Sequence, residues 1–133
     1  MNLEKAFVNT VYRTFFPGES VDIRIGILHP RLDELIGGRP WAFISACNPG
    51  SVLCSDNAAR HTRLIEKLDD LGYRHFPGTG IPLEGGWPPE TSLLVCGIGD
   101  REAVALGLEF GQHAIVCGEC GKAARLVWSG KAL

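Results

Sequence analysis

Apolar and polar positions along the first half of the chain repeat with two different periods. Apolar residues recur every three to four positions over residues 3–15, which predicts a helix that ends at Pro17-Gly18. Residues 21–25 alternate between apolar and polar, as a half-buried strand does. Residues 41–47 are nearly all apolar, which favours a strand buried on both faces. A short helix over residues 31–36 is expected between these two strands.

The second half of the chain begins with the longest predicted helix. Residues 56–71 carry one apolar stripe and a charged opposite face, with Ser55 or Asp56 as the N-cap and Gly72 at the end. Residues 77–89 hold eight glycines and prolines, which predicts a loop that we expect to act as a lid. The remaining expected elements are a strand over 73–76, a strand over 91–98, a helix over 100–110, and a hairpin of residues 113–117 with 123–128.

This order of elements predicts an α+β or α/β domain, with about three to four helices flanking a mixed sheet. The length of 133 residues suits one domain that spans residues 1–133. The chain is 45% hydrophobic and 21% charged, contains no membrane-length apolar run, and shows no secretory signal. Its five cysteines are most simply reduced thiols. We therefore expect a soluble, cytoplasmic protein.

The net charge of the chain limits the kinds of binding partner that we expect. A net charge of −2 provides no basic surface for nucleic acid or anionic lipid, so neither nucleic acid nor a membrane is an expected partner. A small-molecule ligand stays open as a partner, and so does another protein.

Two apolar strands are joined to unusually polar loops, where α/β proteins commonly place their sites. The strand over 41–47 leads into one polar loop, and a second polar segment precedes the strand over 91–98. The predicted ligand-binding set is Asn48, Asn57, Ser92 and Gln112, with Trp87 as a wall and Glu90 as the carboxylate. Amide side chains suit a planar polar group such as an amide or a base edge, and Glu90 is the candidate catalytic acid or base. The alternative is that these residues only form turns and helix ends.

Arg60 is an additional ligand-binding candidate, because a guanidinium on the first turns of the long helix can clamp a carboxylate or phosphate. The alternative is an exposed arginine paired with Glu66 or Asp56. Cys117 and Cys120 have the spacing of two zinc ligands, but a structural zinc site needs two more ligands and no second such pair exists. Redox chemistry and an ordinary turn are the other interpretations of this pair.

The chain resembles a family of small, mostly bacterial proteins known as the domain of unknown function DUF3293. The matching residues, in order, are Tyr12, Ala42-Phe43-Ile44-Ser45-Ala46, Asn48-Pro49, Ser55, Asn57, Trp87, Glu90, Ser92, Phe110-Gly111-Gln112 and Ala114-Ile115-Val116. The sequence departs from the family pattern at Cys47, where a larger residue is expected, and at the Cys117 and Cys120 pair. The resemblance implies a shared site without naming its chemistry.

These observations together predict a small domain with a polar pocket for a small-molecule or nucleotide-like ligand, or a small enzyme that uses Glu90 as acid or base. The alternatives are a protein-interaction module without chemistry and a domain stabilised by zinc on Cys117 and Cys120.

Overall fold

One seven-stranded sheet organises the structure, a computed structural model that describes residues 2–130. In chain order the elements are α1 (Leu3–Val8), β1 (Thr10–Phe16), β2 (Glu19–Ile23), α2 (Pro30–Leu35), β3 (Trp41–Ile44), the 3-10 turn η1 (Pro49–Ser51), α3 (Asn57–Leu71), β4 (Arg74–Pro82), β5 (Glu90–Cys96), α4 (Asp100–Glu109), β6 (Ala114–Gly118) and β7 (Arg125–Trp128). No helix within residues 2–130 is long and apolar enough to cross a membrane.

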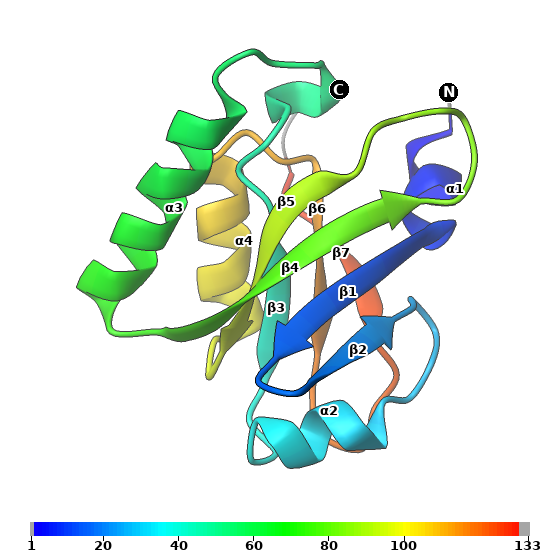
Figure 1. The fold of residues 1–133 in the computed structure, drawn as a ribbon, viewed down its shortest axis with the longest axis vertical. Helices are drawn as coiled ribbons and strands as arrows, with labels where there is room; N and C mark the ends of the chain where they lie inside the picture. The colour runs from blue at the N-terminus through cyan, green and yellow to red at the C-terminus, as the bar shows by residue number, and fades with distance from the viewer. Residues whose placement is uncertain (1, 131–133) are drawn as a thin grey trace.

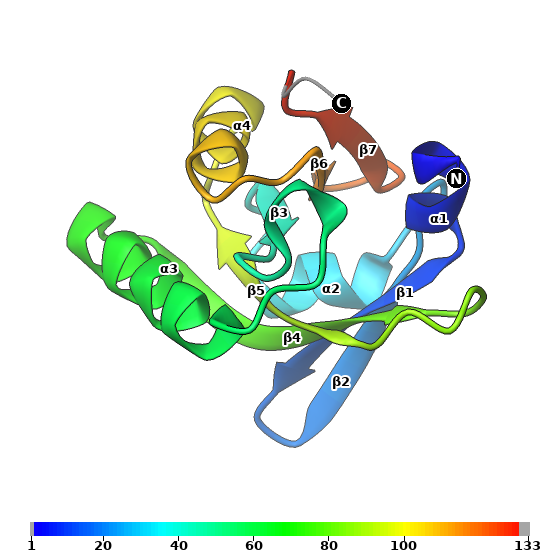
Figure 2. The ribbon, with the colours of Figure 1, turned by 90° about the horizontal axis from the view of Figure 1, so that it is seen from above.

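The strands follow the order β2-β1-β4-β5-β3-β6-β7, and every pairing among the described residues is antiparallel. The sheet curls into an open arc, and α1 lies between its two ends, beside β1 and β7 (Figure 2). The prediction of helices flanking a sheet is confirmed in the α+β form, with four α-helices in the described part of the chain. The sheet is antiparallel where we expected a mixed one.

Helices α3 and α4 lie side by side over the convex face of the sheet (Figure 1). The apolar stripe of α3 buries Leu64 and Leu68 completely, and α4 contributes Ala103 and Leu106. These side chains pack on alternate residues of the central strands, among them Val95. Burying each leucine contributes about 1.5–3 kcal/mol, so this layer holds α3 and α4 on the sheet.

The concave face of the sheet has a second apolar core. Trp41, Phe43 and Leu94 point into the arc from β3 and β5, and Leu32 and Ile36 cover them from α2. Helix α2 lies at one end of the strands and α1 near the other (Figure 1). The second core lies beside α2, and a cavity lies beside α1.

The predicted helix over residues 3–15 is wrong beyond Val8, because Thr10–Phe16 forms strand β1. Threonine and aromatic residues dominate this segment, and both favour extended backbone. Tyr12 and Phe16 point into the concave core, and the segment is hydrogen-bonded to β2 on one side and β4 on the other. Pairing with β2 and β4 therefore determines the structure of this segment, although the spacing of its apolar residues also fits a helix.

The predicted loop over residues 77–89 is wrong over its first half, because β4 continues to Pro82. Pro82 pairs with the first residue of β1, and Pro77 lies just outside the β1 ladder, so neither ring disrupts the ladder's interior. Gly78 is required by close packing: a Cβ there would lie 2.7 Å from the Phe43 ring. The connection that remains, residues 83–89, is short.

The other predicted elements agree with the structure to within a few residues. The long helix is α3, which ends at Gly72 in the left-handed conformation. The predicted C-terminal hairpin is the antiparallel pair β6 and β7.

Candidate functional site

A cavity of about 350 Å³ lies in the concave face of the sheet, at the end closed by α1. Phe43, Ser45 and Ser92 form its floor from β3, the residue after β3, and β5. Its walls come from α1, from the loop after β4, and from the segment around Asn48. Side chains from distant parts of the chain thus meet at one end of the arc.

The space in the cavity comes in part from a glycine in β4. In the row of Thr14, Gly78 and Ser92, paired across β1, β4 and β5, the Phe43 ring fills the space over Gly78. In the next row, Gly80 lies between Tyr12 and Glu90. A Cβ at Gly80 would meet only the Thr10 methyl group, at 3.8 Å, so the position opposite the sheet is empty. Glycine therefore leaves open space between Tyr12 and Glu90.

Asn48 connects the end of β3 to Glu90 at the start of β5. Its backbone is in the left-handed region, with φ 49°, which asparagine tolerates better than most residues. The amide Nδ2 donates to Glu90 Oε2 at 2.7 Å. Asn48 is only 4% exposed, so the donor of this bond is shielded from water, whereas Glu90 is half-buried. An unusual backbone conformation thus aims a buried amide at the carboxylate.

Asn57 and Cys54 determine the orientation of the Asn48 amide. Asn48 Oδ1 accepts from Asn57 Nδ2 at 2.9 Å and from the Cys54 backbone N–H at 3.0 Å. Asn57 Oδ1 in turn accepts from the Asn48 backbone N–H at 2.8 Å. Because Oδ1 accepts two N–H groups, Nδ2 must face Glu90. Asn57 acts through Asn48 and does not line the cavity.

Trp87 supplies the second donor to Glu90. Its indole Nε1 lies 3.2 Å from the same oxygen, Oε2. Both donors can only donate, so Oε2 must accept and any proton on Glu90 resides on Oε1. Within residues 2–130, no donor is hydrogen-bonded to Oε1. One carboxylate oxygen is thus committed to the protein and the other is available to a ligand.

The other two predicted ligand-binding residues with long polar side chains support the loops around the cavity. Arg60 donates from Nε to the Ala46 carbonyl at 2.7 Å and from Nη2 to the Phe110 carbonyl at 2.6 Å. It does not line the cavity. Gln112 lines the cavity, but its Nε2 donates to the Cys47 and Phe110 carbonyls. Both side chains therefore tie the end of β3 to the end of α4.

The hydroxyl groups on the cavity floor also have partners. Ser92 donates to the Glu90 carbonyl at 3.1 Å, and Ser45 donates to the Thr91 carbonyl at 3.0 Å. Each oxygen retains a lone pair for a ligand.

The sequence-based prediction of the site missed two parts of the cavity lining, Tyr12 and helix α1. The Tyr12 hydroxyl donates to the Phe7 carbonyl at 2.6 Å, and its pKa is raised above the usual value by burial. Leu3 and Phe7 of α1 face the cavity, and Phe7 also makes an edge contact with Trp128 of β7. The alternation Thr10, Tyr12, Thr14, Phe16 was the available signal, because it marks one face of a strand.

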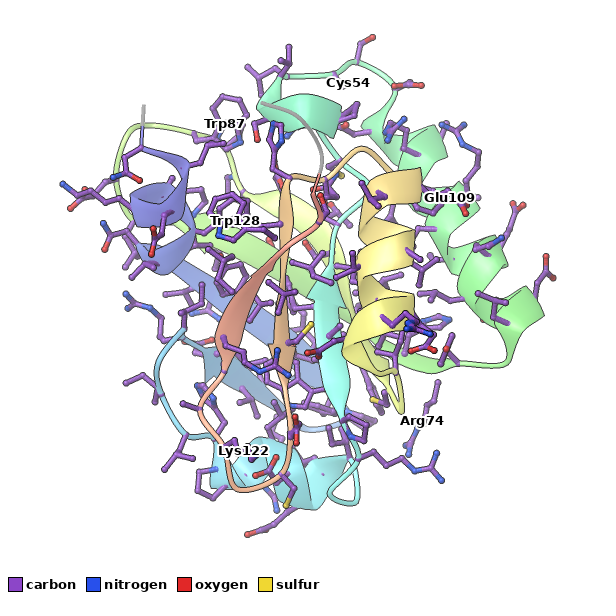
Figure 3. All side chains as sticks on the ribbon, turned by 180° about the vertical axis from the view of Figure 1, so that it is seen from behind. Cys54, Arg74, Trp87, Glu109, Lys122 and Trp128 are labelled. Carbon is purple, nitrogen blue, oxygen red and sulfur yellow. The ribbon has the colours of Figure 1, made fainter. Side chains whose placement is uncertain are left out.

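Neither Cys117 nor Cys120 lines the cavity, and the two lie in different surroundings. Cys117 is buried in β6, whereas Cys120 is exposed in the hairpin turn next to Gly38 of the α2 end. Figure 3 shows Lys122 of this hairpin at the opposite end of the molecule from Trp87 and Cys54. The described residues contain no group of three or more His, Cys, Asp or Glu side chains suited to a metal.

The fold and the cavity define a small α+β domain in which the oriented Glu90 carboxylate lines a partly aromatic pocket. A protein-family model described as "Protein of unknown function (DUF3293)" matches residues 44–115, and the chain belongs to this family. The expected family is thereby confirmed. The matched segment includes every predicted ligand-binding residue and Glu90. No curated protein and no solved structure matches the chain.

Proposed function

We propose that the protein binds a small molecule in the cavity above Gly80, with Glu90 Oε1 accepting a hydrogen bond from the ligand. The supporting observation is the arrangement of Glu90: Asn48 and Trp87 hold Oε2, and Oε1 has no donor within residues 2–130. Such positioning by neighbouring groups is typical of binding and catalytic sites. The aromatic rings of Tyr12 and Phe43 provide the apolar surface that small-molecule pockets commonly have.

The same arrangement supports catalysis as a second candidate function. A carboxylate that exchanges its proton at one defined oxygen can act as a general base toward a bound substrate. Glu84 also lines the cavity, but it is exposed on the loop after β4, and no side chain within residues 2–130 is hydrogen-bonded to it. Glu90 is therefore the better candidate for acid–base chemistry.

The test is a screen of small polar compounds by ligand-observed NMR, repeated on the Glu90→Gln and Glu84→Gln variants. Binding to the wild type that is lost in Glu90→Gln and kept in Glu84→Gln would support the proposal. Both variants remove one carboxylate from the same cavity, so the pair separates the role of Glu90 from a general change in charge. Equal binding by all three proteins, or none, would contradict it and favour an interaction module.

The zinc alternative has a separate test. Native mass spectrometry of the purified protein, compared with its denatured mass, would reveal a bound zinc ion on Cys117 and Cys120. Loss of that mass in Cys120→Ser would assign it to the pair.

We also infer that the protein works in a reducing compartment such as the cytoplasm. All five cysteines are free thiols, and three of them, Cys47, Cys96 and Cys117, are buried singly. Unpaired thiols suit compartments in which disulfides are kept reduced.

A further inference from the structure

The Glu90 carboxylate has no positively charged partner within residues 2–130. Only the neutral N–H groups of Asn48 and Trp87 donate to it. Arg60, in the first turn of the nearby helix α3, uses its guanidinium for two carbonyl groups. Glu90 is half-buried, and even partial withdrawal of a carboxylate from water without a counter-charge costs free energy. A ligand that carries the missing positive charge would offset that cost.

The cavity walls independently favour a cation. Four aromatic side chains line the space: Phe7, Tyr12, Phe43 and Trp87. Tyr12 and Phe43 form an edge-to-face pair with centroids 5.3 Å apart, and both line the cavity. Aromatic faces attract ammonium and guanidinium groups, most strongly where water is excluded.

The other charged groups that line the cavity do not change its expected preference for a cationic ligand. Glu84 and Lys5 are exposed at its edge and offset one another in charge. Glu90 therefore determines the charge at the inner end, beside Gly80 and Tyr12.

We propose that the ligand is an organic cation, an amidinium, guanidinium or ammonium group on an apolar body. Its charged end lies above Gly80, donates to Glu90 Oε1 and contacts the Tyr12 ring. Its apolar body faces Phe43 and Phe7. This inference depends on the proposed function of the cavity and specifies the class of ligand.

The test uses three compounds of nearly the same shape: benzamidine, which is cationic at neutral pH, benzamide, which is neutral, and benzoate, which is anionic. The indole N–H of Trp87 reports binding by NMR because it is hydrogen-bonded to Glu90. Its signal is assigned with the Trp87→Phe variant. A charged hydrogen bond contributes about 1.5–3 kcal/mol, so benzamidine should bind about 10- to 100-fold more tightly than benzamide.

The Glu90→Gln variant sharpens the test. Asn48 and Trp87 both donate to Oε2, so the glutamine oxygen must occupy that position and its NH₂ must replace Oε1. The substitution thus replaces the acceptor at the Oε1 position with a donor, while the shape of the side chain is preserved. Benzamidine should lose its advantage, and benzamide, whose carbonyl accepts, should bind at least as well as benzamidine. Retained selectivity for benzamidine in Glu90→Gln would overturn the inference.

The outcomes separate the two proposals. If benzamide or benzoate shifts the Trp87 signal at lower concentration than benzamidine, the cavity binds ligands but the preference for a cation is wrong. If none of the three compounds moves that signal while Glu90→Gln itself does, the cavity does not bind compounds of this size, and both proposals fail.

Discussion

Asn48 Nδ2 and Glu90 Oε2 lie 2.7 Å apart, although 42 residues separate them in the chain. The bond joins the segment between β3 and η1 to the first residue of β5, and it is made from a residue with positive φ. A backbone conformation that costs free energy is retained where the side chain it positions makes several bonds, here to Glu90, Asn57 and Cys54.

Replacing Asn48 should therefore destabilise the protein through two separable effects. Asn48→Gly removes three side-chain hydrogen bonds, worth about 1 kcal/mol each, but relieves the backbone strain. Asn48→Ala removes the same bonds and keeps a Cβ at positive φ, which costs about 1–2 kcal/mol more. Urea denaturation should rank stability as wild type, then Asn48→Gly, then Asn48→Ala. Equal stability of the two variants would show that the backbone changes conformation when the side chain is lost.

The fold and the site around Asn48 were only partly predictable from the sequence. Strands and helices with one dominant period were predicted, as α3 shows through Leu64 and Leu68. The prediction for residues 10–16 was wrong because the aromatic residues there fit both a helical and a strand period. The prediction for β4 was wrong because Gly78 reflects close packing against Phe43 and not a turn. The meeting of Asn48, Trp87 and Glu90 was predicted, since all three flank strand ends. The contribution of α1 and Tyr12 to the cavity depends on how the sheet curls, and the local sequence pattern does not specify that curvature.

Arg60 offers a second prediction, about stability. Arg60→Lys keeps the charge but cannot reach the Ala46 and Phe110 carbonyls together, because a lysine lacks the planar fork of donors. We expect a loss of about 0.5–1.5 kcal/mol in the free energy of unfolding, since one of the two hydrogen bonds is lost while the Phe110 carbonyl keeps its bond from Gln112. Arg63→Lys is the matched control. Arg63 is on the same helix, with its side chain 53% exposed and 4.0 Å from Asp56, and its replacement should stay within about 0.5 kcal/mol of wild type. Similar losses in both variants would contradict the structural role of Arg60.

Gly78 and Gly80 give a third prediction, because both lie in β4 and face the arc but have different surroundings. A Cβ at Gly78 would lie 2.7 Å from the Phe43 ring and 2.9 Å from the Arg13 carbonyl, whereas at Gly80 the nearest atom is 3.8 Å away. Gly78→Ala should destabilise the protein by about 1–3 kcal/mol through overpacking. Gly80→Ala should leave the melting temperature nearly unchanged and weaken ligand binding, because its methyl group enters the cavity. A Gly80→Ala variant that binds as well as wild type would place the ligand elsewhere.

The buried thiols give a prediction about pH. Burial, with the nearby Asp100 carboxylate adding to it, raises the pKa of Cys117 from 9.0 to about 12, and burial raises that of Cys96 to about 11. The folded state therefore favours the protonated thiols, and the unfolded state loses their protons first as pH rises. The stabilisation is fully present below pH 9.0, and it is lost as pH rises from there toward the folded-state values.

Urea denaturation at a series of pH values should show stability falling above about pH 9, by at most about 1.4 kcal/mol per pH unit for each thiol. Cys117→Ala should lower stability at neutral pH and also reduce the alkaline slope, because it removes one of the titrating groups. Cys120→Ser is the control, since Cys120 is exposed in the hairpin turn and its replacement should leave the slope unchanged. In the native protein an alkylating reagent should modify Cys120 rapidly and Cys117 only after unfolding. An unchanged alkaline slope in Cys117→Ala, or rapid native labelling of Cys117, would show that β6 does not protect this thiol.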